Sequence, residues 1–88
     1  MKSLHEVYHA IIKDSLEMAR KGPGNLDYAA AYARAGLSDP DVTDGRSLTH
    51  EAHTQALYVR TNLAGWRGTE AKAGRTLLDK LLKEYKKK

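Results

Sequence analysis

The sequence predicts an all-α fold, a small bundle of about four helices at approximately 3–21, 26–35, 48–64 and 69–86. Apolar residues recur at helical spacing within the longer segments, which indicates helices with one buried face. Turn-forming Gly and Pro residues separate the segments, and no strand-like alternation of apolar and polar residues stands out. A chain of 88 residues is expected to form a single domain, 1–88, with a basic C-terminal tail at 86–88.

The first segment carries signals for both ends of a helix. Ser3 followed by Glu6 is a capping-box pattern, in which each side chain satisfies a backbone N–H of the first turn. Gly22-Pro23-Gly24 is expected to end the helix. The spacing predicts one apolar face, made of Leu4, Val7, Tyr8, Ile11, Ile12, Leu16 and Ala19.

The second segment is short and rich in alanine. Asn25 is expected to cap it, and Asp27 complements the helix dipole. Gly36 is interpreted as a left-handed terminator. Because small side chains let a neighbouring helix approach closely, we expect this helix to be sandwiched between others.

Residues 38–47 are predicted to form a loop, because Asp39-Pro40 and Asp44-Gly45 are both turn-forming pairs. The aspartates of this loop faintly resemble a calcium-binding loop. The spacing differs, since the third Asp, the Gly and the following Glu51 each come one residue late. We interpret the carboxylates as helix caps.

The third helix is expected to begin near Ser47 or Thr49 and to break at 65–68, and Thr69 is expected to cap the fourth. The apolar stripe predicted for the third helix is Leu48, Ala52, Ala56, Val59 and Leu63, widened by Leu57. In the fourth helix a 3-4-3-4 spacing, typical of a helix pair, joins Ala71, Gly74, Leu78, Leu81 and Tyr85. This seam and the small core of so short a chain predict a homo-oligomer.

The composition excludes several classes of protein. The chain has no Cys, which rules out disulfides and thiolate chemistry and favours a reducing cytoplasm. No run of roughly 20 apolar residues is present, so we expect no membrane span. No nucleophile–base–orienter pattern and no Gly-rich phosphate loop after a strand can be found, so we expect neither an enzyme nor a cofactor.

The four histidines form a second possible metal-ligand pattern in the sequence. His5 and His9 are four residues apart, and His50 and His53 are three apart, so each pair shares a helix face. If the helix ends met, the four could complete a tetrahedron. Surface histidines explain the same pattern more simply, and no metal site is predicted.

Positive charge is concentrated at the C-terminal end. Residues 1–59 carry six Lys or Arg against eight Asp or Glu, whereas residues 60–88 carry nine against three. Such a local field attracts an anionic partner, here an acidic protein surface or a nucleotide-like ligand. An aromatic ring beside an arginine at a helix N-terminus suits the same ligands. The predicted binding residues are Tyr58, Arg60, Asn62, Trp66, Arg67, Lys72 and Arg75.

Two questions stay open at the level of sequence. Trp66 serves either as a plug at the end of the bundle or as a binding platform. Two alternative functions remain. The protein could bind a nucleic acid, whose backbone would follow the basic row of the last helix, Lys72, Arg75, Lys80, Lys83 and Lys86. It could also be a structural assembly subunit.

The pattern Leu57-Tyr58, Asn62-Leu63 and Trp66-Arg67-Gly68 resembles one found in small, uncharacterised helical proteins that phages and prophages encode. It covers about a quarter of the chain and carries no assigned activity. The resemblance implies an accessory protein in a bacterial host cytoplasm, where it would bind a host component.

Overall fold

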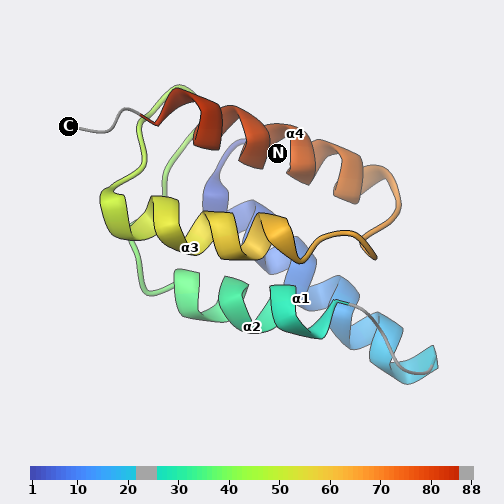
Figure 1. Cartoon of the computed structure of the whole chain (residues 1–88). Coiled ribbons are helices and arrows are strands. Elements are labelled where there is room, and N and C mark those ends of the chain that lie inside the picture. The colour runs from blue at the N-terminus through green and yellow to red at the C-terminus, as the bar shows by residue number, and fades with distance from the viewer. Residues whose placement is uncertain (22–25, 86–88) are drawn as a thin grey trace.

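The computed structural model describes residues 1–21 and 26–85, which form four helices joined by turns and loops (Figure 1). The helices are α1 (Leu4–Lys21), α2 (Asp27–Gly36), α3 (His50–Thr61) and α4 (Thr69–Glu84). The prediction of a small all-α bundle is confirmed. Residues 22–25 and 86–88 lie outside the described residues, and with them the predicted Gly-Pro-Gly stop, the Asn25 cap and the basic tail.

The four helices are arranged as a ring. α1 contacts α2 and α4, and α3 contacts the same two helices. Figure 1 shows that α2 and α3 run in opposite directions, as do α3 and α4. The outer surface of the α2–α3 pair therefore lies on the opposite side of the bundle from the outer surface of the α1–α4 pair.

The predicted apolar stripes form the core. The stripe of α3 is buried along its whole length, and so are Leu4, Val7, Tyr8 and Ile11 of α1. The seam of α4 is also buried from Ala71 to Leu81, against the other helices of the same chain. This seam therefore offers no free surface to a second copy.

Two apolar residues placed in the core by periodicity are exposed instead. Leu16 is 57% exposed, because it follows the buried Ser15 and therefore points about 100° away from the core side of α1. Leu57 is 45% exposed, because the buried side of α3 is already filled by the narrow stripe of Ala52, Ala56 and Val59.

The N-terminus of α1 is held by the loop between α2 and α3. The N–H of Leu4 donates to the carbonyl of Val42 at 2.8 Å, and the N–H of His5 donates to Oδ1 of Asp41 at 2.8 Å. The N–H of Glu6 donates to Oγ of Ser3 at 3.3 Å, which is half of the predicted capping box. An isolated antiparallel bridge between Ser3 and Thr43 fixes the loop in this position.

Three capping predictions have different outcomes. Thr49 caps α3, since its hydroxyl accepts from the N–H of Ala52 at 3.1 Å. Thr69 does not cap α4: it is the first helical residue, and the residue before it is Gly68, whose φ of 106° favours glycine. The prediction that Gly36 ends α2 in a left-handed conformation is also wrong, because Gly36 is the last residue of the helix and its φ is not positive.

Gly36 is required for a different reason. A β-carbon at this position would lie 2.5 Å from Cε2 of Tyr8, a separation that van der Waals packing does not allow. The glycine therefore lets the ring of Tyr8 reach the backbone of α2.

None of the described helices is both long enough and apolar enough to cross a membrane.

Candidate functional site

Trp66 is a plug and not a platform. Its side chain is only 1% exposed, and its Nε1–H donates to Oδ2 of Asp14 on α1 at 2.6 Å. The six-membered ring of the indole packs against Gly74 of α4. A ligand therefore has no access to this ring, and of the two roles that the sequence left open for Trp66 the structure has the plug.

Two of the predicted arginines are engaged within the chain. One guanidinium nitrogen of Arg75 donates to the carbonyl of Leu63 at 2.6 Å and to the carbonyl of Trp66. Arg60 forms a bidentate salt bridge with Asp79 of α4, in which Nε donates to Oδ1 at 2.7 Å and Nη2 donates to Oδ2 at 3.4 Å. Arg75 thus holds the connection between α3 and α4, and Arg60 ties these helices together.

The polar residues predicted on α3 lie away from the basic residues of α4. The side-chain amide of Asn62 donates to the carbonyl of Tyr58 at 2.8 Å, within the same helix. Tyr58 is 51% exposed and stacks on Tyr32 of α2, with ring centroids 5.2 Å apart. These residues therefore belong to the outer surface of the α2–α3 pair.

Arg67 and Lys72 are exposed, and neither takes part in an ion pair within the described part of the chain. Arg67 borders a shallow hollow of about 300 Å³ whose lining includes the carboxylates Asp14 and Glu17. Lys72 lines a different and larger groove beside α4. The seven predicted residues thus do not converge on one site, and only Lys72 lines this groove.

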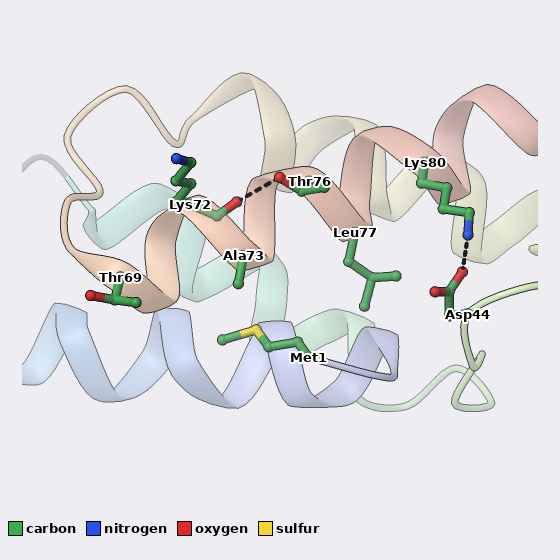
Figure 2. A pocket seen from close by; sticks show the side chains of 8 residues that line it. All are labelled: Met1, Asp44, Thr69, Lys72, Ala73, Thr76, Leu77 and Lys80. Carbon is green, nitrogen blue, oxygen red and sulfur yellow. Dashed lines mark hydrogen bonds and ion pairs between the residues drawn. The ribbon is translucent and has the colours of Figure 1, made fainter.

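The groove has a volume of about 450 Å³ and lies between α4, the N-terminal residue and the loop that follows α2 (Figure 2). Its apolar part is formed by Met1, Ala73 and Leu77. Lys72, Thr76 and Lys80 follow one another at four-residue spacing, so they lie in a row along α4. The remaining lining residues are Asp44 and Thr69.

One end of the groove carries an exposed ion pair. Nζ of Lys80 lies 2.7 Å from Oδ1 of Asp44, and both side chains are about half exposed (Figure 2). The hydrogen bond to Asp44, and then the attraction of its charge, raise the pKa of Lys80, which stays protonated. At the other end of the groove, the ammonium group of Lys72 has no such partner.

The histidine pairs do not meet. Nε2 of His5 donates to the carbonyl of Asp39 at 2.9 Å, and His9 is exposed on α1. His50 and His53 lie on α3, near Tyr85 at the end of α4. The ring of His53 stacks on that of Tyr85 with centroids 3.8 Å apart, and Nδ1 of His50 lies 3.3 Å from the Tyr85 hydroxyl. Across residues 1–21 and 26–85, no three His, Asp or Glu side chains are close enough together to hold a metal ion.

Of the carboxylates of the acidic loop, Asp41 has the predicted capping role and Asp44 does not. Asp41 accepts from the N–H of His5, and Asp44 pairs with Lys80. Burial opposes ionisation of Asp41, but hydrogen bonds from the His5 N–H and the Ser3 hydroxyl outweigh it and lower the pKa of Asp41. These two carboxylates are thus engaged with different elements and do not converge on one site.

Comparison with known proteins gives no relative: no family model, no curated protein and no solved structure matches this chain.

Sequence reasoning found one residue of the groove and missed most of the others. Lys72 was among the predicted binding residues, and Lys80 appeared only in the basic row of the nucleic-acid alternative. The four-residue spacing of Lys72, Thr76 and Lys80 was the signal available for that side of the groove. Asp44 and Met1 gave no such signal, because only the folding of the loop onto the N-terminus brings them to α4.

Proposed function

We propose that this protein is a non-enzymatic binding protein that engages an acidic segment of another protein in the groove beside α4. The observation that carries the proposal is an apolar groove of about 450 Å³ with Lys72 unpaired near one end and Lys80 exposed at the other. Thr69, in the first turn of α4, also lines this groove, where the positive end of the helix dipole attracts anions and the charge of Glu70 in the same turn offsets part of that attraction.

The spacing of the lysines indicates the length of the partner segment. Lys72 and Lys80 are eight residues apart, which corresponds to about 12 Å along a helix. In the structure Lys80 is turned to Asp44 at one end of the groove and Lys72 lies towards the other, which favours a ligand longer than a single carboxylate or phosphate. A peptide with acidic residues on either side of an apolar stretch can contact both, with its apolar side chains on Ala73 and Leu77.

The pair between Lys80 and Asp44 does not block this end of the groove. Both side chains are about half exposed, and solvent-exposed pairs of this kind contribute little to stability. A carboxylate of the partner can therefore replace Asp44 at small cost. Formation of such a complex would weaken as salt concentration rises, because the charges involved are solvent-exposed.

The two other anionic partners receive less support. A nucleotide would require an aromatic surface for its base, and the described residues that line the groove include no aromatic side chain. A nucleic acid would need the full basic row of the last helix. In that row Arg75 is turned to the loop carbonyls, Lys80 is paired, and Lys86 lies outside the described residues.

The test uses a synthetic helical peptide that carries two glutamates eight residues apart with leucines between them, labelled for fluorescence anisotropy. Lys72→Glu should weaken binding by about tenfold, since it replaces an attraction by a repulsion. Lys83→Glu is the matched control, because Lys83 is exposed on the same helix but does not line the groove. Equal weakening by both variants would show that only the overall charge matters and would reject the groove.

A pull-down from a bacterial lysate with the same variants identifies the natural partner. The resemblance to phage-encoded proteins, which stays a prediction, would make that partner a host protein. We expect the partner to be retained by the unchanged chain and by the Lys83→Glu variant, and to be lost from the Lys72→Glu variant.

A further inference from the structure

Exposed apolar side chains are gathered on one side of the bundle. Among the described residues, the large hydrophobic side chains that are exposed are Leu16, Tyr28, Leu57 and Tyr58. Three of these four lie on the α2–α3 pair, where Tyr28 is 73% exposed. The stacking of Tyr32 on Tyr58 joins the two helices across this surface.

The helical register shows that the centre of this surface contains no charged residue, whereas Glu51, seven residues before Tyr58, lies on the same side of α3 at its N-terminal end. On α2 the outward positions follow i, i+3, i+4 and i+7 spacing, and the same holds on α3. We call these eight residues the uncharged face: Tyr28, Ala31, Tyr32 and Ala35 of α2, and Thr54, Leu57, Tyr58 and Thr61 of α3.

The two threonines of the uncharged face are less polar than their type implies. The hydroxyl of Thr54 donates to the carbonyl of His50 at 3.1 Å, and that of Thr61 donates to the carbonyl of Leu57 at 2.6 Å. Because both hydroxyl protons are engaged within α3, these side chains need no acceptor from a partner. Their methyl groups therefore add to the apolar surface.

Charged residues lie at the edges of this surface. Asp27 faces α1, since its Oδ1 accepts a hydrogen bond from Ser15 at 3.2 Å. Arg34 lies seven residues further on, along the same edge of α2. On the side of α4, Arg60 is held by Asp79. An apolar centre with a charged rim is the usual organisation of a protein–protein interface.

We propose that the occupant of the uncharged face is a second copy of this chain. The chain carries a net charge of +4, so two copies repel each other wherever their basic surfaces approach. A two-fold axis sets the same patch of both copies against itself, and a patch without charges meets its own image without like-charge repulsion. An acidic or basic partner would find no complementary charge at the centre of this face.

The size of the face determines the strength of the dimer. Two adjacent helices, of which the longer has 12 residues, give a surface about 18 Å long and about 20 Å wide. This corresponds to roughly 360 Å² in projection, less than the roughly 800 Å² per partner of a standard interface. We therefore expect a weak dimer that dissociates on dilution, independent of the groove beside α4 on the other side of the bundle.

The experiment is sedimentation equilibrium of the full chain between about 1 µM and about 500 µM, a range that brackets micromolar dissociation constants. The average mass should rise from 9.8 kDa towards twice that value. Tyr28→Lys should raise the dissociation constant at least about tenfold, because it places like charges opposite each other across the axis. At 73% exposure this residue tolerates lysine without loss of the fold.

Leu16→Lys is the matched control, since it adds the same charge and removes an exposed apolar residue of α1, outside the uncharged face. It should change the dissociation constant by less than about twofold. A chain that stays monomeric at the highest concentration overturns the proposal. So does a dimer that Tyr28→Lys leaves intact, or one that both variants weaken equally.

Discussion

The indole ring of Trp66 packs directly against the backbone of Gly74. A β-carbon on Gly74 would lie within 2.6 Å of Cζ3 of Trp66 and 3.4 Å from Cγ1 of Val7. The same indole donates its N–H to Asp14 at 2.6 Å. The ring thus contacts both α1 and α4 at the end of the bundle where α3 leads into α4, and it sets how closely these helices approach.

Gly74→Ala should therefore destabilise the fold, although alanine is the better helix former by about 1 kcal/mol. Forcing a methyl group into a filled core usually costs about 1–3 kcal/mol, and here the rigid indole must move. We expect a lower free energy of unfolding in urea, followed by Trp66 fluorescence. Thr76→Ala, at an exposed position of the same helix, is the control and should change the stability by less than about 0.5 kcal/mol.

The arginines at 67 and 75 should behave differently, because only one of them is engaged with the backbone. Arg75→Ala leaves the carbonyls of Leu63 and Trp66 without their charged donor and should cost about 1–3 kcal/mol of stability. Arg67→Ala should cost less than about 0.5 kcal/mol, since its side chain is exposed. Thermal unfolding by circular dichroism checks both. Similar losses in the two variants would contradict the assignment of Arg75 to the connection.

The hydroxyl of Tyr8 is buried and has no hydrogen-bond partner among the described residues. Burial, and then the charge of Asp39, raise the pKa of Tyr8 well above its ordinary value of 10.0. Since an unsatisfied buried hydroxyl is itself costly, Tyr8→Phe should be neutral or stabilise the fold by up to about 1 kcal/mol. Tyr8→Ala should cost about 3–5 kcal/mol, because it empties the space beside Gly36. Urea denaturation of both variants measures the difference, and a clear loss on Tyr8→Phe would reveal a partner for the hydroxyl.

Asp41 should make the fold sensitive to acid. Its pKa in the folded chain is below the ordinary value of 3.8, so its carboxylate stabilises the fold above about pH 4 and loses this effect as the pH falls through the folded pKa. Asp41→Asn keeps an acceptor oxygen for the His5 N–H but removes the negative charge at the N-terminus of α1, so it should cost no more than about 1 kcal/mol at pH 7. The two proteins should converge in stability near pH 2. Glu17→Gln, on the exposed side of α1, should differ from the unchanged chain by less than about 0.5 kcal/mol at pH 7.

The helices could be predicted from the sequence because each stripe of apolar residues is local and has the period of the structure it forms. The stripe from Leu48 to Leu63 is buried throughout. Periodicity cannot tell how wide the buried side is or where a neighbouring helix stops. Leu16 and Leu57 have nearly the spacing of the core residues, yet each lies outside the narrow buried side of its helix and is exposed.

The groove could not be predicted, because it depends on contacts between distant segments. The loop from α2 to α3 reaches α4 only after pairing with residues 2–5, which places Asp44 beside Lys80. Whether a given Lys or Arg is engaged within the chain also depends on contacts between distant segments. Nothing in the sequence around Arg75 distinguishes it from Lys72, and only the course of the preceding connection turns its guanidinium inward.

The ring order of the helices has a consequence for how such a protein would act. The groove beside α4 and the uncharged face lie on opposite sides of the bundle, so two copies joined at that face would present their grooves outward, in opposite directions. Such a dimer is bivalent: it links two partner molecules, or two acidic segments of one long partner, and does not enclose either. Rising concentration of the protein would then convert weak single contacts into binding by avidity.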